Sequence, residues 1–568
     1  MDKQHSTPEL NLIFSTVLIE EFTRLQVSTI AISPGSRSGP LTVAAARHPN
    51  IHKKVHIDER GLGYYALGAA KSTNKPAIII TTSGTALANL MPAIVEASMD
   101  HIPMIIISAD RPSALYDTAS NQTIDQIKIF GSYVRWFMDI PCPSSLNSLD
   151  RLISAADQSY HLATLPTNEG PVHINCHFDD PLLPKPEFML TQGHLPIHLH
   201  QWFNDNQPFS IISRPLSGHS EEDYQTTAQQ INKSISGLIV LGKIDPLEET
   251  AQLINLINKL NWPVFPDISS QLKMDDVHNT IIPHFEMMLF TDPTLKSHKF
   301  ETILHVGGRI NSKKLGTLLA NLNACQYIRV QNTLQRDEEF RVSTIRFTSI
   351  HSFCVRILPY LKTKEPIAST SLLQKDSKEI KLRLEADTSY SEVTICKQLS
   401  QCIPVEHQLF IGNSMAIRNM QMASLFDKRS PRIFVNRGAS GIDGLIATAC
   451  GCAEASKTPT TILLGDSSAL HDLNSLQLVS MSNIPIIVII INNNGGAIFS
   501  SLAISKWKEL VTPYFIAPHG HTFEHFAKGF NIDYTNISSI HDFKDAYLTS
   551  LGSKTSIIIE CTIHKTDQ

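Results

Sequence analysis

The sequence has little net charge, no long apolar run and no regular spacing of cysteines. Its 568 residues carry a formal net charge of −5, whereas a nucleic-acid-binding protein needs a basic face. The longest apolar run, Ile484–Ile491, is about half as long as a membrane-spanning helix requires. These absences give no reason to expect a nucleic acid or a membrane as a partner.

The nine cysteines are dispersed along the chain and odd in number. Such a set argues against a disulfide framework and for a reducing compartment. The first residues, Met1-Asp2-Lys3-Gln4-His5, lack the basic and then apolar pattern of a secretory signal. We therefore expect a cytoplasmic protein.

Short β-branched runs alternate with helical patterns, which is typical of parallel sheets covered by helices. Apolar residues make up 42% of the chain and charged residues 18%, so several buried cores are feasible. We predict an α/β fold with mainly parallel sheets and with Ala-rich helices at Leu62–Lys71 and Ala86–Met99. The predicted strands are Ser28–Ile32, Ala77–Thr81, Met104–Ser108, Val172–Asn175, Gly237–Leu241, Val264–Asp267, Thr302–Val306, Gln408–Ile411, Ile433–Asn436, Thr461–Leu464, Ile484–Asn492 and Thr555–Glu560.

Composition also indicates where domains end. A Pro-, His- and Phe-rich stretch, 180–215, and a polar, charged segment, 362–379, interrupt the alternation. We predict three consecutive α/β domains, spanning 1–185, 205–360 and 380–568.

Two loops in the last third place oxygen ligands after predicted strands. Gly465-Asp466 follows one strand, and Asn492–Gly496 ends the next. Open α/β sheets bind ligands at the carboxyl ends of their strands, and Mg²⁺ prefers hard oxygen ligands together with phosphate oxygens. We predict a Mg²⁺ site formed by the Asp466 carboxylate, one amide oxygen of Asn492–Asn494 and a backbone carbonyl near Gly495. A helix beginning after Ser467-Ser468 would direct its N–H groups at a diphosphate. Each loop alone is also a common turn sequence.

The segment His56–Gly61 places two acidic residues, Asp58 and Glu59, before an Ala- and Gly-rich helical pattern. Acidic residues favour helix N-termini, so a carboxylate here is compatible with a simple cap. The alternative is a carboxyl group that takes part in proton transfer.

Several further strings are distinctive. They are Ile32–Ser38, Asp58–Gly61, Thr82–Thr85, Ala109–Pro112, Asn121-Gln122, Gly412–Ser414, Asn436–Gly444 and Asn492–Gly496. With them the chain resembles the thiamine-diphosphate-dependent decarboxylases and carboligases, and most specifically the 2-succinyl-5-enolpyruvyl-6-hydroxy-3-cyclohexene-1-carboxylate synthases. The resemblance covers nearly the whole chain. It implies a thiamine-diphosphate-binding fold with a pyrimidine-binding, a middle and a diphosphate-binding domain, in that order.

The resemblance implies a set of contacts to thiamine diphosphate. Glu59 would place its carboxyl group against the aminopyrimidine ring and activate the cofactor, and an apolar setting would favour the protonated carboxyl. Ile442 would be the apolar wedge that holds the cofactor bent. The other implied cofactor-binding residues are Ser414, Gly441, Gly465, Asp466, Ser467, Ser468, Asn493, Gly495, Ile498 and Phe499. Of these, the resemblance implies Asp466, Asn493 and the Gly495 carbonyl as the ligands of Mg²⁺ (or Mn²⁺).

The implied substrates are 2-oxoglutarate and isochorismate, each with two carboxylates. Arginine suits such ligands because its guanidinium group makes bidentate, charge-assisted hydrogen bonds. Where the family often has Lys-Arg, this chain has Lys313-Lys314, and lysine lacks the guanidinium fork. The implied substrate-binding residues are Ser36, Arg37, Arg111, Asn121, Gln122, Lys313, Ser414, Arg418, Arg437, Ile498, Phe499 and Leu502.

The implied reaction is decarboxylation of 2-oxoglutarate and 1,4-addition of the succinyl carbanion to isochorismate, a step of menaquinone biosynthesis. A homodimer or homotetramer is also implied, because Glu59 has to meet the diphosphate site across a subunit interface. Two alternatives stay open. One is another 2-oxoacid decarboxylase or acetolactate-type carboligase, which would not need the arginine-rich set. The other is a cofactor-binding regulatory subunit without catalysis, which would not need Glu59.

Overall fold

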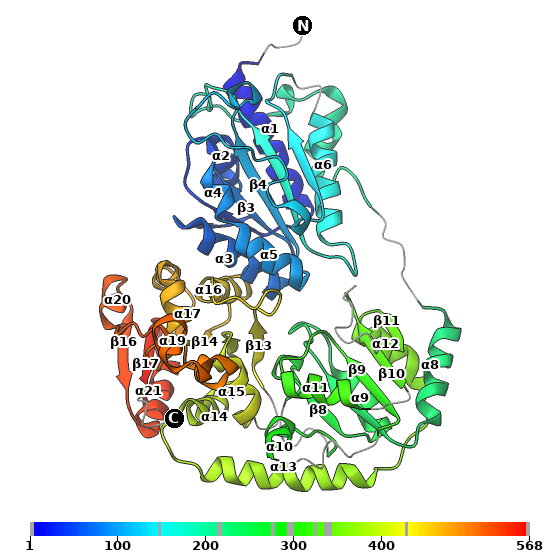
Figure 1. Ribbon diagram of the computed structural model, residues 1–568. Helices are drawn as coiled ribbons and strands as arrows, with labels where there is room; N and C mark the ends of the chain where they lie inside the picture. The colour runs from blue at the N-terminus through cyan, green and yellow to red at the C-terminus, as the bar shows by residue number, and fades with distance from the viewer. Residues whose placement is uncertain are drawn as a thin grey trace. The chain divides into compact units, whose positions relative to one another are not determined.

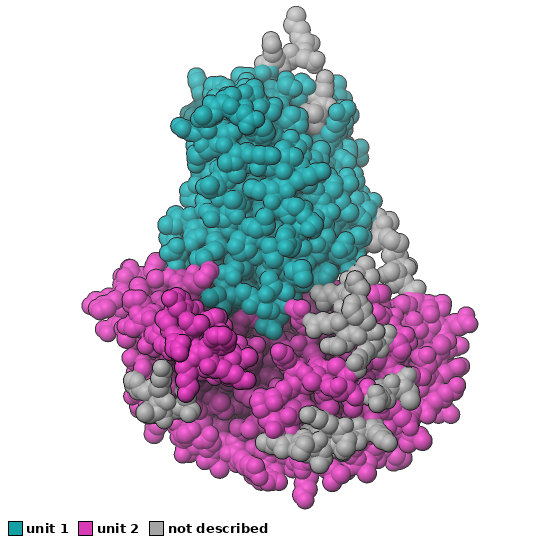
Figure 2. Space-filling model, viewed as in Figure 1, with its two compact units in different colours: residues 1–215, 436–457, 474–481 teal, residues 216–435, 458–473, 482–568 magenta. Residues whose placement is uncertain are grey.

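The computed structural model describes residues 5–145, 149–212, 219–273, 279–291, 300–322, 326–333, 343–426 and 430–563. The chain divides into two compact units, coloured separately in Figure 2. Unit 1 comprises residues 1–215, 436–457 and 474–481, and unit 2 comprises the rest. Three sheets of parallel strands flanked by helices form the two units (Figure 1), so the predicted α/β fold is confirmed. The three predicted domain ranges stay a prediction.

Unit 1 is built on a six-stranded parallel sheet with the order β2-β1-β3-β4-β6-β5. The strands β1, β3, β4 and β6 are buried along their whole length. The strands are β1 (Thr29–Ile32), β2 (His52–Val55), β3 (Ala77–Thr81), β4 (Met104–Asp110), β5 (Phe137–Ile140) and β6 (Pro171–His177). The helices of this unit are α1 (Thr7–Arg24), α2 (Gly39–Arg47), α3 (Glu59–Thr73), α4 (Thr85–Ala88), α5 (Met91–Asp100), α6 (Leu149–Ala163), α7 (His200–Asn204), α16 (Leu445–Ser456) and α18 (Leu476–Ser480).

Helices α3 and α16 pack backbone to backbone because both are rich in small residues. A Cβ atom on Gly68 would lie 1.9 Å from the carbonyl oxygen of Thr448, and one on Gly451 would lie 2.0 Å from that of Tyr65. Cys452 is buried here and its thiol donates to the Gly68 carbonyl (3.3 Å). The approach of the two helices therefore requires glycine on each of them.

Unit 2 holds a five-stranded parallel sheet, β11-β10-β9-β7-β8, and a six-stranded one, β13-β12-β14-β15-β17-β16. Its strands are β7 (Gly237–Leu241), β8 (Val264–Pro266), β9 (Thr302–Val306), β10 (Gln326–Gln331), β11 (Thr344–Phe347), β12 (Gln408–Ile411), β13 (Arg432–Val435), β14 (Thr460–Gly465), β15 (Ile486–Asn492), β16 (Asp533–Ile537) and β17 (Ile557–Thr562). Its helices are α8 (Glu221–Lys233), α9 (Ala251–Leu260), α10 (Phe285–Thr291), α11 (Lys313–Asn321), α12 (Ile350–Ile357), α13 (Ala368–Ala386), α14 (Glu392–Cys402), α15 (Met415–Ala423), α17 (Asp466–His471), α19 (Lys508–Val511), α20 (Glu524–Gly529) and α21 (Ile540–Leu551).

The two six-stranded sheets have the same topology. When each sheet's strands are numbered from its own first strand, both read 2-1-3-4-6-5. The sequence shows no short repeat, so the two six-stranded sheets share a topology without an obvious common sequence pattern.

Two predicted elements differ from the structure. The polar segment 362–379 is mostly helix, because α13 begins at Ala368 and continues beyond it. The single helix expected at Ala86–Met99 is two, α4 and α5, since the chain turns at Asn89-Leu90 just before Pro92, a residue that favours a helix start. Among the described residues, none of the helices combines the length and the apolar composition needed to cross a bilayer.

A buried pair of carboxyl groups holds the segment that leaves unit 1. Glu21 of α1 accepts hydrogen bonds from the Trp202 indole (2.6 Å) and the Phe209 N–H (2.7 Å), and Asp157 of α6 accepts one from the Ser210 N–H (2.9 Å). Both carboxyl side chains are buried. Burial, together with the hydrogen bond to Asp157, raises the pKa of Glu21 to about 8.

This pair predicts a stability that depends on pH. Because the folded-state pKa of Glu21 lies above its ordinary value of 4.5, the stabilisation is complete below pH 4.5 and is lost as pH rises through 8. We expect the melting temperature of the wild type, relative to Glu21→Gln, to fall by roughly 2 °C between pH 5 and pH 9. Thermal unfolding of both proteins over this range measures it, and a constant difference would contradict the raised pKa of Glu21.

Candidate active site

Two loops of unit 2 meet at the carboxyl ends of β14 and β15. These strands are paired in register, with Gly465 opposite Ile491, so Asp466 and Asn493 follow neighbouring strand ends as the sequence predicts. Asp466 is buried, and its Oδ2 accepts a hydrogen bond from the Gly495 N–H (2.8 Å). The structure therefore brings the two predicted metal-binding loops together.

The second loop depends on a glycine. Gly495 has φ +123°, and a Cβ atom there would lie 2.2 Å from the Ile516 carbonyl oxygen. Asn494 also has a left-handed backbone (φ 64°), and its side-chain oxygen accepts from the backbone N–H groups of His519 (3.0 Å) and Gly520 (2.8 Å). These bonds place the His519 Nε2 3.2 Å from Asp466 Oδ2.

The predicted helix after Ser468 begins earlier. Helix α17 starts at Asp466 itself, and Ser467 and Ser468 lie in its first turn. The Ser467 backbone N–H donates to Asp466 Oδ1 (2.5 Å), and its hydroxyl donates to the same oxygen (3.2 Å). Gly465 precedes the helix, and a Cβ atom there would meet no heavy atom within 4 Å. The space beside the Gly465 backbone is therefore open.

The side chain of Asn493 is oriented by a residue from a distant part of the chain. Its amide nitrogen donates to Glu392 Oε1 at the start of α14 (2.7 Å), while Glu392 Oε2 accepts from Asn419 (2.8 Å). The Asn493 Oδ1 is buried and has no hydrogen-bond partner among the described residues. Burial raises the pKa of Glu392, and both amide hydrogen bonds oppose that shift.

A divalent metal ion fits this arrangement. An orphaned buried carbonyl oxygen costs free energy unless a ligand satisfies it. The Asn493 Oδ1, the Asp466 carboxylate and a backbone carbonyl of the Gly495 loop are the hard oxygens that Mg²⁺ or Mn²⁺ takes.

If Glu392 orients Asn493, its removal has to weaken metal binding. We expect Glu392→Leu to raise the dissociation constant for Mn²⁺ by about 10–100-fold, the effect typical of losing an outer-shell partner. Glu392→Gln should stay closer to the wild type because its amide oxygen can still accept from Asn493. Mn²⁺ titration followed by electron paramagnetic resonance, with thiamine diphosphate present, measures this without turnover. Equal affinities in the wild type and Glu392→Leu would exclude the role.

The other predicted residues of unit 2 lie on separate elements. Ser414 caps α15 with an unusual backbone (φ 65°) and its carbonyl accepts from the Arg418 guanidinium, which is exposed. Ile498 and Phe499 lie in the segment after Gly496 and are half-buried, and Leu502 is exposed. Lys313 is the exposed first residue of α11. Its neighbour Lys314 lies over the ring of Phe290 (3.5 Å).

In unit 1, the two acidic residues at the start of α3 have different roles. Asp58 is the N-cap, and its side chain accepts from the backbone N–H groups of Arg60 (3.0 Å) and Gly61 (3.4 Å). Glu59 is half-buried and accepts from the Ser33 hydroxyl (3.1 Å) and the Asn89 amide (3.5 Å). Asp58 is therefore the residue that caps α3, and the Glu59 carboxyl is available for other chemistry.

Two arginines of unit 1 each keep a buried, unpartnered nitrogen. Arg37 donates to the Phe178 carbonyl (2.9 Å) and to Asp180 (3.0 Å), and Arg111 follows the end of β4. Among the described residues, neither Arg37 Nε nor Arg111 Nε has a hydrogen-bond partner. Burial and the charge of Arg37 lower the pKa of Arg111. Such guanidinium groups suit a bound carboxylate. Ser36, Asn121 and Gln122 are exposed on neighbouring loops.

The loop Asn436–Gly444 is held in unit 1 by Glu96 of α5 and Tyr64 of α3. Buried Glu96 accepts from the backbone N–H groups of Gly438 (2.8 Å), Ala439 (2.6 Å) and Ser440 (3.3 Å). The Tyr64 hydroxyl donates to Asp443, and a Cβ atom on Gly444 would overlap the Tyr64 ring. Half-buried Arg437 and Gly441 and exposed Ile442 lie on this loop.

Sequence reasoning missed the residues that support these loops. Glu96 is one of two acids in the otherwise largely apolar helix Met91–Asp100, and Glu392 follows a Ser that caps a helix. Both patterns occur at ordinary surface positions and caps, so neither singles the residue out. The Glu392–Asn493 hydrogen bond joins residues 101 positions apart, and only the fold brings them together.

Comparison with known proteins gives the class first. Residues 14–129 match the family model described as "Thiamine pyrophosphate enzyme, N-terminal TPP binding domain". Residues 195–411 match "Middle domain of thiamine pyrophosphate" and residues 417–561 match "Thiamine pyrophosphate enzyme, C-terminal TPP binding domain". Together with three parallel sheets and paired loops suited to a metal ion, these matches define a thiamine pyrophosphate enzyme.

Relatives identify the family within that class. The chain is 37% identical to the 2-succinyl-5-enolpyruvyl-6-hydroxy-3-cyclohexene-1-carboxylate synthase of Aeromonas salmonicida, over 96% of this chain and 93% of the relative. It is 35% identical to the synthase of that name from Salinibacter ruber, over 97% and 94%, and 36% identical to that from Chlorobium phaeobacteroides, over 97% and 95%. The chain belongs to the 2-succinyl-5-enolpyruvyl-6-hydroxy-3-cyclohexene-1-carboxylate synthase family.

Proposed function

We propose that this enzyme decarboxylates 2-oxoglutarate and adds the resulting succinyl carbanion to isochorismate, a step of menaquinone biosynthesis. The product is 2-succinyl-5-enolpyruvyl-6-hydroxy-3-cyclohexene-1-carboxylate. The observation that carries the proposal is the similarity to synthases of that name over at least 96% of the chain. The buried, unpartnered guanidinium nitrogens of Arg37 and Arg111 support it, because both substrates carry two carboxylates.

Different residues of the chain would hold the metal ion and the proton that the cofactor needs. Thiamine diphosphate, when bound, supplies a carbon nucleophile and an electron sink for the decarboxylation. Asp466, Asn493 and the Gly495 carbonyl would hold Mg²⁺ or Mn²⁺ and through it the diphosphate. Glu59 would hold a proton at the aminopyrimidine ring.

Substrate binding would rest on the arginines. Arg37 and Arg111 would bind carboxylates of the substrates, and a guanidinium group fixes orientation as well as charge. Arg418 and Arg437 belong to the same proposed set, together with Ser36, Asn121, Gln122, Lys313 and Ser414. Ile498, Phe499 and Leu502 would cover the apolar side of the substrates.

We further propose a homodimer or homotetramer in which Glu59 of one subunit meets the metal-binding loops of another. We also propose that the enzyme works in the cytoplasm. The eight cysteines that the structure describes are free thiols, as a reducing compartment favours.

The test uses the purified protein with Mg²⁺, thiamine diphosphate, 2-oxoglutarate and isochorismate. Release of CO₂ together with the adduct mass supports the proposal. Turnover of pyruvate in place of these substrates would favour another carboligase, and cofactor binding without turnover of any substrate would favour a regulatory subunit.

A further inference from the structure

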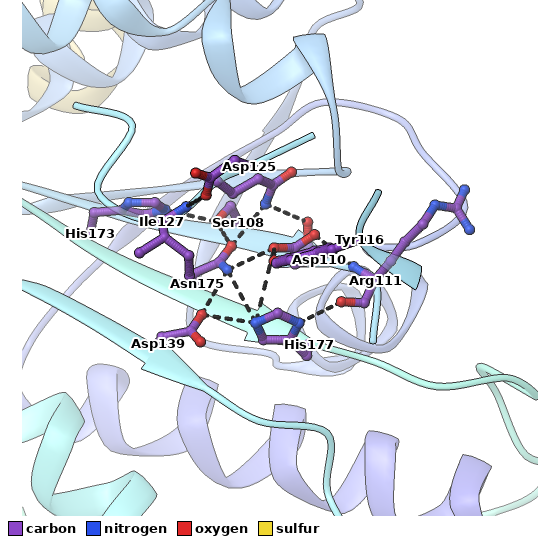
Figure 3. A network of polar contacts seen from close by, with 12 residues as sticks. Ser108, Asp110, Arg111, Tyr116, Asp125, Ile127, Asp139, His173, Asn175 and His177 are labelled. Carbon is purple, nitrogen blue, oxygen red and sulfur yellow. Dashed lines mark hydrogen bonds and ion pairs between the residues drawn. The ribbon is translucent and has the colours of Figure 1, made fainter. Parts of the chain in front are cut away.

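The polar side chains of β6 lie on one face of a strand that is buried throughout. His173, Asn175 and His177 alternate with Val172, Ile174 and Cys176, and the latter three belong to the apolar core of unit 1. The alternation that marks this segment in the sequence therefore does not separate a buried face from a solvent face. It separates an apolar core from a buried polar network (Figure 3).

Asn175 is the centre of this network. Its Oδ1 accepts from the Ser108 hydroxyl (2.7 Å) and the Gln126 amide (2.8 Å). Its Nδ2 donates to Asp110 Oδ2 (2.8 Å) and Asp139 Oδ1 (2.8 Å). One side chain thus joins β4, β5, β6 and the segment after β4.

His177 makes contacts through both ring nitrogens. Its Nδ1 contacts the backbone carbonyl of Arg111, and a carbonyl oxygen only accepts, so Nδ1 donates. Its Nε2 lies 2.8 Å from Asp139 Oδ1 and 3.4 Å from Asn175 Nδ2. His177 therefore bridges Asp139 and the Arg111 backbone, with Asp110 Oδ2 4.0 Å away. Figure 3 shows this bridge, with the Arg111 side chain pointing away from it.

The segment that the network holds is the loop 111–126, which carries Arg111, Asn121 and Gln122. At its first end, His177 holds the Arg111 carbonyl and Asp110 accepts from the Arg111 N–H (2.7 Å). At its other end, buried Gln126 donates to Asn175 and accepts from the Gly84 N–H (2.8 Å).

The loop between these ends has a strained backbone. Asp117, Ala119 and Gln122 have φ values of 58°, 58° and 52°, each a left-handed conformation that non-glycine residues adopt only when the surroundings impose it. Fixed ends supply that constraint.

Stability alone does not account for this contact. His177 is buried, whereas the Asp139 side chain is 39% exposed, and a partly exposed contact between such groups contributes little to stability. What an apolar pair cannot provide is a donor for the Arg111 carbonyl. A donor that is itself held by a carboxylate fixes the backbone directly next to the guanidinium.

We propose that His177 and Asp139 are positioning residues that hold the loop 111–126 and aim the Arg111 guanidinium at a substrate carboxylate. The proposal rests on the proposed function, in which Arg111, Asn121 and Gln122 bind substrate. It adds two residues that touch neither substrate nor cofactor and act through the Arg111 backbone.

The test compares His177→Leu, Asp139→Asn and the wild type with a matched control, His198→Leu, which makes the same change at an exposed histidine of unit 1. Hydrogen–deuterium exchange reports on the loop without turnover. We expect His177→Leu to speed exchange in 111–126 by roughly tenfold, as the loss of the hydrogen bond to the Arg111 carbonyl implies, and to leave α3 unchanged. Asp139→Asn should have a smaller effect in the same direction, because its amide group can still form a hydrogen bond with Nε2.

Steady-state kinetics provide the second readout. In His177→Leu we expect the KM of at least one dicarboxylate substrate to rise roughly tenfold, while kcat changes by less than about threefold. Loop exchange in His177→Leu that matches the wild type would overturn the proposal. If His177→Leu speeds exchange in α3 as much as in the loop, the comparison passes to Asp139→Asn. An equal increase of exchange in α3 and in the loop of Asp139→Asn would also overturn the proposal. A wild type that turns over neither substrate contradicts only the proposed function, since the exchange result still decides the positioning role.

Discussion

Glu59→Gln is expected to lower kcat by about 10²–10⁴-fold, the usual contribution of a positioned acid–base group. The fold should not change, because Asp58 and not Glu59 caps α3. A glutamine keeps the size of the side chain and can still accept from Ser33, but it cannot exchange a proton with the aminopyrimidine ring. Steady-state kinetics with saturating cofactor, together with thermal unfolding of the same samples, measure both parts.

The matched control for this variant is Glu222→Gln. Glu222 lies in the first turn of α8 and is exposed, so the same chemical change should leave kcat at the wild-type value. Full activity in Glu59→Gln would remove the proton-transfer role of this residue and would favour a different origin of cofactor activation.

Asp466→Ala is expected to raise the dissociation constant for Mg²⁺ by at least about 100-fold, beyond the 10–100-fold typical of an outer-shell partner. The substitution removes the only charged oxygen of the proposed ligand set and also the acceptor for the Gly495 N–H. Cofactor affinity should fall with it, because in the proposed site the metal ion would link the loops to the diphosphate. Calorimetric titration of metal-free protein with Mg²⁺ and thiamine diphosphate measures both constants.

Two further variants sharpen this result. Asp466→Asn keeps the acceptor geometry and loses the charge, so its metal affinity should lie between those of the wild type and Asp466→Ala. Asp545→Ala removes an exposed carboxylate of α21 from the same unit and should bind the metal like the wild type. Tight Mg²⁺ binding by Asp466→Ala would show that the metal ion is held elsewhere.

The strands that sequence reasoning identified are mostly the inner ones. Met104–Asp110 and Ile486–Asn492 are buried along their whole length, and such strands read as continuous apolar runs. The missed strands β2, β5, β11 and β16 lie at sheet edges, whereas the missed β10 lies inside its sheet, where Gln326, Arg329 and Gln331 interrupt its apolar residues. An edge strand exposes backbone and side chains on one side and carries polar residues there. The sequence His52-Lys53-Lys54-Val55 of β2 shows this and gives no strand signal.

For the candidate site too, some residues could be predicted from the sequence and others could not. Asp466, Asn493 and Glu59 stand in short local motifs, so their residue types and spacing were visible in the chain. Their supporting residues were not, because Glu392 and Asn493 are brought together only by tertiary structure. The segment Val172–Asn175 was predicted as a strand and forms part of β6, but its alternation does not have the usual meaning. Alternation normally indicates a strand with one solvated face, whereas here the polar side chains satisfy one another inside the protein.

The central claim is that the Glu59 carboxyl and the Asp466 metal site act on the same cofactor across a subunit interface. Mixing Glu59→Gln with Asp466→Ala after dissociation and reassembly tests it most directly. Each mixed dimer then contains one site with both groups intact, so random reassembly should restore about a quarter of the wild-type activity from two inactive proteins. No recovery, with mixed dimers demonstrated by native mass spectrometry, would contradict the claim.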